Sequence, residues 1–384
     1  MLDIDPVSEN DTVTILLKLV GEVCNLDCAY CYERRKPYAG NRIMDPSLVF
    51  NLLERFSGNP LRIELHGGEP LLYPRLRMRQ LVSILENAEN VVGVSMQTNG
   101  TLLDEDWLRI FSPISDRFEL GVSLDGPGGA NSWRIDHHGR PAFSTIVKGL
   151  NLLERMDVRS GVIAVVTKQS LRDPAQIVEF VGKFKNVRLL KFVPCFDFGV
   201  QQAAGPTRSK AARDAADVGS AFGEAWAISP AEYADFLGEA YHAWMASGAT
   251  SSLVVEPFLA VAQAVLGSTT ETCTFSTTKC RHVVTLYPDG SVGACDELDK
   301  RDAALDPTLQ NINLAFEGCA ASAVAKERMR RCAGCLYFTR CKGGCIATRQ
   351  RFHRVGREEE YCNYRRALID FMEAQVASIG AMAQ

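Results

Sequence analysis

The sequence lacks the features that would direct a chain into or across a membrane. It contains no run of about 18 apolar residues, so a membrane-spanning helix is not expected. Its first residues, MLDIDPVSENDTV, place no cationic segment ahead of an apolar one, so no secretory signal peptide is predicted. We therefore expect a cytoplasmic location and no membrane partner.

An excess of positive charge is also missing. The 42 Lys and Arg residues against 46 Asp and Glu residues give a formal net charge of −4, so no global field recruits nucleic acid. The composition is globular, with 46% hydrophobic and 23% charged residues. A length of 384 residues favours two or three domains, or one large barrel with an appendage.

Cysteine, by contrast, is abundant. The chain has 13 cysteines, an odd number, and it is long enough to bury a core without disulfides. Nine of the 13 lie in residues 267–384. In a chain without a secretion signal, clustered thiols indicate ligands of a metal or an iron–sulfur cluster.

The first half of the chain alternates β-rich runs with amphipathic helical patterns. Helices are predicted at 46–57, 75–88, 104–111, 143–156 and 174–184. Strands are predicted at Thr12–Val20, Leu61–Leu65, Val91–Gln97, Phe118–Ser123, Val162–Thr167 and Val187–Val193. Six such units predict an α/β fold with right-handed crossovers, namely a partial (β/α)6 barrel, TIM-like but two units short of eight.

The remaining sequence divides into two parts. We predict a barrel domain at 1–195, an insertion with bridging helices at 196–266, and a small iron–sulfur-organised domain at 267–384. Residues 196–228 lack periodicity and are expected to form a loop, whereas Ser229-Pro230 caps a helix that runs to about Met245. Two β-rich arms around 288–290 predict a hairpin.

The first cysteine group lies in a loop directly after the first strand. Cys24, Cys28 and Cys31 have the spacing C-x3-C-x2-C. Three thiolates suit a cubane cluster and leave one iron open to a substrate, whereas an electron-transfer site closes all four. A structural zinc is the alternative, although no further Cys or His lies within the loop.

This triplet, with Tyr30 before its last cysteine, resembles the signature of the radical S-adenosylmethionine (SAM) superfamily. The resemblance implies that the open iron chelates SAM and that an electron cleaves it to methionine and a 5′-deoxyadenosyl radical. The segments HGGEP (66–70), QTNGTL (97–102) and GVSLDGP (121–127) also look like superfamily segments. The SAM contacts implied in this way are Tyr30, Gly67, Gly68, Glu69, Pro70, Asn99, Ser123, Arg134, Phe192 and Val193.

Each of these residues also has a simpler interpretation. The two glycines after His66 are found in ordinary turns as well as beside ligands. Arg134 would suit the carboxylate of SAM through its bidentate fork, or it is a solvated loop charge. Phe192 and Val193 either pack on the adenine or belong to the core.

The second cysteine group resembles the SPASM domain, the twin-cluster module of peptide- and protein-modifying radical SAM enzymes. The resemblance implies two auxiliary [4Fe–4S] clusters, so the chain would hold three clusters and SAM. It assigns one auxiliary cluster to an inner set, Cys273, Cys280, Cys295 and Cys345. The other belongs to an outer set, Cys332, Cys335, Cys341 and Cys362. A zinc ribbon is the alternative for the outer spacing.

Two cysteines and one carboxylate complete the list of candidates. Cys195 is expected to be a packed thiol, and Cys319 lies outside the SPASM pattern. In the sulfatase maturases that the chain resembles, an Asp directly after an auxiliary-cluster cysteine acts as the base, and here Asp296 follows Cys295. Otherwise Asp296 is a helix cap or an exposed loop acid.

The resemblance predicts a radical SAM/SPASM maturase acting on a ribosomal precursor peptide. Hydrogen abstraction from a side-chain carbon would lead to a cross-link, either a cyclophane or a thioether. The alternative is an anaerobic sulfatase-maturating enzyme that oxidises Cys or Ser to formylglycine. A three-cluster electron carrier and an RNA-modifying enzyme are less compatible with the open first site and the net charge.

The expected partners follow from this prediction. They are a peptide or protein substrate and a reductant such as flavodoxin or ferredoxin. Because only about ten residues precede the first strand, a separate leader-recognition protein is expected unless the substrate binds the barrel directly. The basic stretch that includes Arg328, Arg331 and Arg349 either docks an acidic leader or is a solvated helical face.

Overall fold

The structure is a computed structural model, and it describes most of the chain. The described residues are 5–33, 42–196, 225–270, 272–298, 302–306, 308 and 311–382. Most of the predicted loop at 196–228 lies outside them. Among the described residues, every helix is too short or too polar to cross a bilayer.

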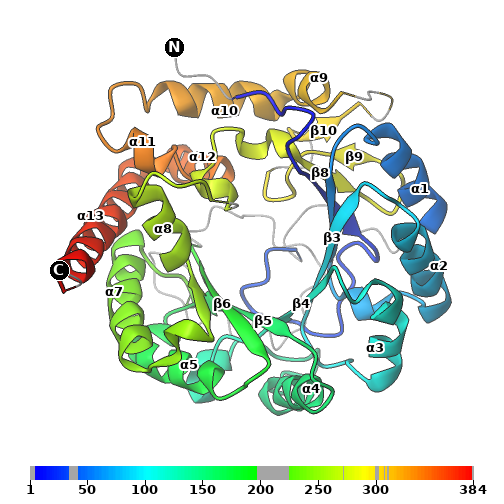
Figure 1. Cartoon of the computed structure of the whole chain (residues 1–384), viewed down its shortest axis with the longest axis horizontal. Coiled ribbons are helices and arrows are strands. Elements are labelled where there is room, and N and C mark those ends of the chain that lie inside the picture. Colours follow the sequence, from blue (N-terminus) through cyan, green and yellow to red (C-terminus); the bar gives the residue numbers. More distant parts are fainter. Residues whose placement is uncertain are drawn as a thin grey trace.

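The six predicted β/α units are confirmed. The strands are β1 (Val13–Lys18), β2 (Leu61–His66), β3 (Val91–Thr98), β4 (Phe118–Ser123), β5 (Ser160–Val166) and β6 (Val187–Pro194). They pair in parallel in this order. The helices between them are α1 (Pro46–Arg55), α2 (Arg75–Glu86), α3 (Glu105–Phe111), α4 (Phe143–Arg155) and α5 (Pro174–Gly182). Figure 1 shows these helices on the outside of a curved sheet.

Local sequence explains both the helices and the two faces of the sheet. The carboxylate of Asp45 accepts a hydrogen bond from the backbone N of Ser47 at 3.0 Å, and Pro46 occupies the first turn of α1. In β2, Leu61, Ile63 and Leu65 are buried, whereas the residues that alternate with them are only partly buried. Since those residues are Arg62, Glu64 and His66, this face of β2 is polar.

Two further parallel strands extend the six-stranded sheet. β7 (Val254–Glu256) pairs with β6, and β8 (Val283–Leu286) pairs with β1. β9 (Val292–Gly293) pairs antiparallel with β8, and β10 (Ala304–Leu305) pairs antiparallel with β9. The ten-stranded order is therefore β10-β9-β8-β1-β2-β3-β4-β5-β6-β7, so β10 and β7 are the two edges and the barrel is open. The sequence did not predict β7, which has three residues, nor the pairing of β8 with the barrel.

The predicted hairpin and capped helix are both confirmed. β8 and β9 (Val292–Gly293) pair antiparallel around Gly290, whose φ is 81°, and β10 (Ala304–Leu305) follows. α7 (Pro230–Ala246) begins with a capping box between Ser229 and Glu232. Because β8 belongs to the barrel sheet, the hairpin continues the barrel; the predicted boundary between residues 266 and 267 stays a prediction.

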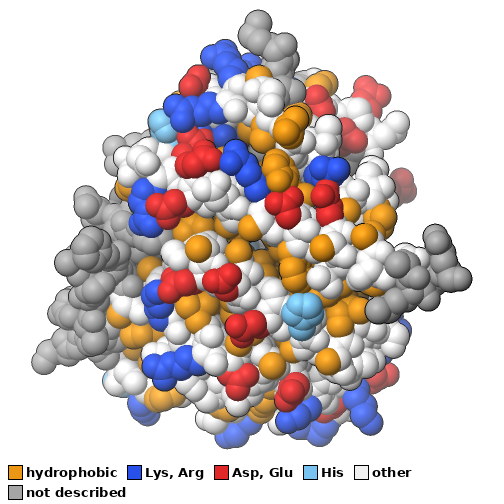
Figure 2. All heavy atoms as spheres, turned by 90° about the vertical axis from the view of Figure 1, so that its left-hand side faces the viewer, with side chains coloured by type: hydrophobic (Ala, Val, Ile, Leu, Met, Phe, Trp, Pro, Cys, Tyr) orange, Lys and Arg blue, Asp and Glu red, His pale blue; other side chains and the backbone are white. Residues whose placement is uncertain are grey.

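The C-terminal helices cover the open side of the barrel. They are α8 (Phe258–Val265), α9 (Ile312–Glu317), α10 (Ala320–Arg330), α11 (Phe338–Cys341), α12 (Ile346–Arg354) and α13 (Glu358–Met382). α13 packs against α7 and α8 and so ties the C-terminus to the barrel (Figure 1). On the face that looks toward the reader in Figure 2, acidic and basic side chains are interspersed among apolar ones.

Candidate active site

The cysteine loop after β1 is held by backbone contacts to the end of β2. The N–H of Gly68 donates to the carbonyl of Gly21 at 2.7 Å, and that of Glu69 donates to the carbonyl of Val23 at 2.8 Å. A Cβ on Gly68 would lie 2.0 Å from the Val23 oxygen. The glycines after His66 therefore allow a close approach, as predicted, but the approach is to the cysteine loop itself.

The same loop is braced on its other side by the segment after β4. The N–H of Asp27 donates to the carbonyl of Ile135 at 2.7 Å, and that of Ala29 donates to the carbonyl of Trp133 at 3.0 Å. Burial raises the pKa of Cys28 to about 12, with Arg134 acting in the opposite direction. An iron cation would reverse this preference because metals bind the thiolate.

Glu69 ties the ends of β2 and β3 together. Its carboxylate is fully buried and accepts hydrogen bonds from Thr98 Oγ1 at 2.6 Å, the N of Asn99 at 2.8 Å and the N of Leu71 at 3.0 Å. Burial raises the pKa of Glu69, and these hydrogen bonds act against the rise. Since each carboxylate oxygen has two lone pairs, the group retains capacity for an ammonium. Pro70 follows it in a short 3-10 turn.

Tyr30, Asp125 and Arg134 form a buried group beside the cysteine loop. Arg134 Nη2 lies 2.8 Å from Asp125 Oδ1, and the Tyr30 hydroxyl donates to Oδ2 of the same carboxylate. Burial disfavours the charge of Arg134, but Asp125 more than offsets this and raises its pKa. A solvated loop charge is therefore wrong for Arg134, which is 6% exposed. Sequence reasoning missed Asp125, although it lies within the quoted GVSLDGP segment.

The other predicted SAM contacts lie on different faces of the sheet. Asn99 Nδ2 is 3.7 Å from Cys24 Sγ, and Ser123 Oγ accepts from Gln97 Nε2 at 2.9 Å. The ring of Phe192 packs edge-on against Phe236 of α7, with centroids 5.0 Å apart. Of the two interpretations of Phe192, packing on the adenine or belonging to the core, the structure therefore supports the core. Val193 alternates with Phe192 and so faces the opposite side of β6.

A buried lysine joins the barrel to the C-terminal region. Lys18 Nζ, at the end of β1, donates to Asp296 Oδ2 at 2.5 Å and to Glu33 Oε1 at 2.7 Å, and lies 3.0 Å from His66 Nδ1. The carboxylate of Asp296 is thus neither a helix cap nor an exposed loop acid, since Asp296 is 7% exposed. The sequence analysis singled out neither Lys18 nor Glu33, although a lysine that ends the apolar run VTILLK is a usable signal.

The position of the Lys18 ammonium explains a further feature of this group. The ligand atoms of Glu33, His66 and Asp296 lie within 4.8 Å of one another, a spacing that suits a single metal ion. The ammonium contacts all three side chains and therefore supplies the cation there. Burial lowers the pKa of Lys18, but Asp296 and Glu33 together raise it well above its ordinary value, so the lysine is charged.

The inner set of cysteines gathers behind the β8–β9 hairpin. A hydrogen bond with Cys295 lowers the pKa of Cys280. Burial raises the pKa of Cys273 to about 12, and the neighbouring Cys345 and Cys280 add to the increase. These effects of one thiol on another show that the fold brings together four cysteines that are up to 72 positions apart in the chain.

The outer set lines one cavity. Its walls include all four predicted ligands together with two arginines: Cys332, Cys335, Cys341, Cys362, Arg349 and Arg365. Cys195, in contrast, packs in a small cluster with Tyr30 and Trp226 and is the expected packed thiol. Cys319 precedes α10 and is buried.

The donor sets fit iron–sulfur clusters. The cysteine loop offers three thiols, the number that leaves one iron of a [4Fe–4S] cluster open. Four thiols line the outer cavity, the number that closes such a cluster.

Comparison with known proteins agrees with this chemistry. Residues 19–181 match the model of the radical SAM superfamily, and this range contains the cysteine loop, HGGEP and Arg134. Residues 19–181 are therefore a radical SAM domain. Its cofactors are accordingly SAM and [4Fe–4S] clusters.

Similar proteins extend over nearly the whole chain. The serine-type anaerobic sulfatase-maturating enzyme of Bacteroides thetaiotaomicron is 23% identical over 91% of this chain and 86% of its own. The cysteine-type enzyme of Clostridium perfringens strain 13 is 27% identical over 87% of this chain and 88% of its own.

Solved structures show the same fold. Native anSMEcpe with bound AdoMet and a peptide superposes with a TM-score of 0.76 and 21% identity, covering 97% of this chain and 100% of that chain. Streptococcus suis SuiB bound to the precursor peptide SuiA gives a TM-score of 0.60 and 14% identity, covering 89% and 73%. The open (β/α) barrel with its C-terminal extension is therefore a shared architecture.

Proposed function

We propose that this enzyme is a maturase that oxidises a side-chain carbon of a peptide or protein. In this proposal Cys24, Cys28 and Cys31 hold the SAM-binding cluster, and the inner and outer sets hold two auxiliary clusters in a SPASM domain. When bound, these groups supply the electron that cleaves SAM and accept the electron that the oxidised substrate gives up. A flavodoxin- or ferredoxin-type reductant would deliver the first electron.

The residues around the cysteine loop would orient SAM. Glu69 offers a buried carboxylate to its ammonium, while the N–H groups of Gly68 and Glu69, between Gly67 and Pro70, hold the cysteine loop beside that carboxylate. Arg134, already fixed by Asp125 and Tyr30, offers its guanidinium to the carboxylate of SAM. Asn99, Ser123 and Val193 line the strand ends where the nucleoside would lie, at the mouth of the barrel.

The observation that carries the proposal is the position of Asp296. This buried carboxylate directly follows the inner-set ligand Cys295, and it also contacts Lys18 at the end of the first barrel strand. A carbon that has lost a hydrogen atom must next lose an electron and a proton. Asp296 lies where a proton acceptor and an electron acceptor would serve the same substrate carbon.

Formation of formylglycine from Cys or Ser is the favoured reaction. The curated relatives that align over 87–91% of the chain are sulfatase-maturating enzymes of both the cysteine and the serine type. Lys18, Glu33 and His66 would keep Asp296 oriented toward the substrate hydroxyl or thiol. The substrate would enter over the polar face of β2.

The ion pair at Asp296 favours a second candidate, the cross-linking of a precursor peptide. A carboxylate bound to an ammonium at 2.5 Å holds a proton weakly. Formylglycine formation must deprotonate a hydroxyl or thiol, whereas an aromatic ring attacked by a carbon radical gives up an acidic proton once it is oxidised. In that case a separate leader-recognition protein would present the precursor.

Peptide products separate the two candidates. The reconstituted enzyme is incubated with SAM, a reductant and a CxPxR-type peptide, and the control is the same peptide with Ala in place of the Cys. Loss of the cysteine sulfur with gain of an aldehyde supports formylglycine formation. Loss of two hydrogens from a precursor peptide, with the CxPxR peptide unchanged, supports the cross-link.

A further inference from the structure

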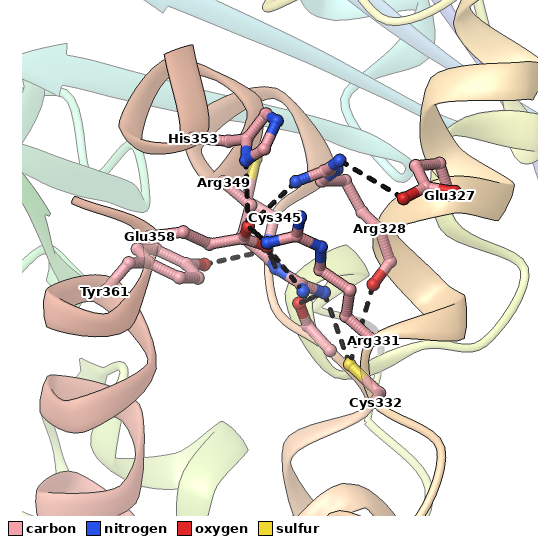
Figure 3. Close-up of polar contacts among 10 residues, drawn as sticks. Glu327, Arg328, Arg331, Cys332, Cys345, Arg349, His353, Glu358 and Tyr361 are labelled. Carbon is pink, nitrogen blue, oxygen red and sulfur yellow. Dashed lines mark hydrogen bonds and ion pairs between the residues drawn. The ribbon is translucent and has the colours of Figure 1, made fainter. Parts of the chain in front are cut away.

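An ionic cluster centred on Glu358 lies beside the outer set. Glu358, the first residue of α13, is 2.8 Å from Arg349 Nη2, 2.8 Å from Arg328 Nη1 and 2.9 Å from Arg331 Nη1. His353 approaches the same carboxylate (Figure 3). Arg328 and Arg349 are 4% and 2% exposed, so both sequence interpretations of this basic stretch, leader docking and a solvated face, are wrong for these two residues.

Arg349 extends from this cluster to a predicted cluster ligand. Its Nη1 donates to Cys332 Sγ at 3.3 Å and to the carbonyl of Gly343 at 3.1 Å. Gly343 has a φ of 83°, and a Cβ there would lie 3.4 Å from the same Nη1 and 2.9 Å from the sulfur of Met329. Glu358 and Gly343 thus hold the guanidinium in place by contacts that do not involve the sulfur.

A second buried guanidinium faces the outer set from α13. Arg365 Nη2 donates to the carbonyl of Cys341 at 3.0 Å and to that of Thr274 at 3.3 Å. Arg365 is 4% exposed, so its guanidinium places a second buried positive charge beside this set.

The charged groups around the inner set differ from this arrangement. Asp296 follows Cys295 and pairs with Lys18, and Glu297 pairs with Arg351 at 2.6 Å. Asp296 thus places a buried negative charge directly after an inner-set cysteine. Lys279 Nζ donates to the carbonyl of Gly344 at 3.1 Å, between the outer-set Cys341 and the inner-set Cys345 in the chain, so it does not distinguish the sets.

We propose that Arg349 is a positioning residue that raises the reduction potential of the outer cluster above that of the inner one. Glu358 holds its guanidinium in place, and the guanidinium donates a hydrogen bond to Cys332. This inference rests on the proposed function. N–H···S hydrogen bonds and nearby positive charge stabilise the reduced, more negative form of a cluster. The electron that the substrate loses together with its proton then rests on the outer cluster, from which a ferredoxin- or flavodoxin-type carrier accepts it. In this proposal the electron thus passes from the substrate to the outer cluster and from there to the carrier.

The test is a potential measurement on the full-length chain. Cys24, Cys28 and Cys31 are all replaced by Ala, so that only the two auxiliary clusters titrate in an EPR-monitored redox titration. Arg349→Gln in this background should lower one midpoint and leave the other in place. The expected shift corresponds to about a tenfold change in the reduction equilibrium, or about 59 mV for one electron.

Two further variants distinguish electrostatics from disruption. Arg331→Gln is the matched control, because Arg331 binds the same Glu358 but is half exposed and contacts no sulfur in the described structure; both midpoints should stay in place. Glu358→Gln removes a negative charge while Gly343 still holds Arg349 Nη1, so the outer midpoint should rise. Opposite shifts in Arg349→Gln and Glu358→Gln are the expected signature.

The outcomes separate this inference from the function on which it rests. About eight irons per chain in the triple-alanine background support the two auxiliary clusters, and a clearly lower count refutes that assignment. With the iron retained, an unmoved midpoint in Arg349→Gln, or shifts of the same sign in both variants, overturns the role of Arg349. If Arg349→Gln loses iron, the sign of the Glu358→Gln shift decides: a rise supports the role and a fall or no shift refutes it.

Discussion

The barrel cysteine loop and the C-terminal cysteine sets hold their thiols in different ways. In the loop, Cys24, Cys28 and Cys31 lie within one short segment, and backbone hydrogen bonds from Gly68 and Glu69 fix its shape. In the C-terminal region, the proposed assignment gives Cys345 to the inner set and the nearby Cys341 to the outer one. The open site is built locally, whereas the closed sites depend on how α10, α12 and α13 pack.

The two regions also differ in their charges. Two buried ion pairs lie beside the barrel cysteine loop, Arg134 with Asp125 and Lys18 with Glu33. Beside the outer set, the two buried guanidiniums of Arg328 and Arg349 converge on Glu358. We infer that the first region is built to bind and orient a cosubstrate, and the second to set the energy of an electron. The predictions below test this division.

The largest effect is expected from the barrel loop alone. Cys28→Ala should abolish release of 5′-deoxyadenosine and remove about four of about twelve irons, because the open cluster needs all three thiolates. Iron analysis and chromatography of the nucleoside measure both. Cys195→Ala is the control, since that thiol is packed among aromatic rings, and its iron content should match the wild type. Full nucleoside release by Cys28→Ala would contradict the assignment of the open site.

The link between the two regions should affect the product and leave the radical intact. Asp296→Asn is expected to leave SAM cleavage unchanged while product falls by roughly 10²-fold, the low end for a lost general base. Product and 5′-deoxyadenosine are quantified in the same reaction. Asp302→Asn serves as the control, because Asp302 forms an exposed pair with Arg354 in the same region. Unchanged product formation by Asp296→Asn would rule that carboxylate out.

The buried ion pair beside the loop should matter for stability. Asp125→Ala leaves the guanidinium of Arg134 buried without its carboxylate, so the free energy of unfolding should fall by about 3–5 kcal/mol. Anaerobic urea denaturation measures this change. Asp106→Ala removes an exposed partner of Arg109 and should cost no more than about 1 kcal/mol. Equal losses in the two variants would show that burial does not distinguish these pairs.

The smallest effect concerns the segment that braces the cysteine loop. The N–H of Arg140, its side chain and the N–H of His138 all donate to Asp136, and they lower the pKa of this exposed carboxyl to about 2. Because the folded pKa is below the ordinary value of 3.8, the stabilisation is complete above that value and is lost as the pH falls through about 2. NMR titration checks this prediction, and a pKa of 3.8 or higher would contradict it.

Much of the barrel was predictable because its signals are local. Short β-rich runs located β1 to β6, and Asp45-Pro46 and Ser229-Pro230 marked helix starts that the structure confirms. The pairing of β8 with β1 was not predictable, since nothing in a short hairpin specifies a partner almost 270 positions away. Periodicity likewise placed Phe192 on a strand but did not decide which face its ring occupies.

The site shows the same limit. The cysteine spacing identified the candidate thiols, and Cys295 drew attention to Asp296. That Lys18 would meet this carboxylate depends on long-range packing of the hairpin against the barrel. The arginines of α10 and α12 looked like a surface stretch because their charge is visible in the sequence, whereas the burial that pairs them with Glu358 is not.

Metal analysis of the anaerobically reconstituted chain, followed by EPR with and without SAM, tests the central claim most directly. The account predicts about twelve irons per chain, arranged as three cubanes, with the spectrum of only one of them changed by the sulfonium compound. Zinc in place of iron, or an EPR spectrum in which SAM changes the signal of none of the three clusters, would contradict the account.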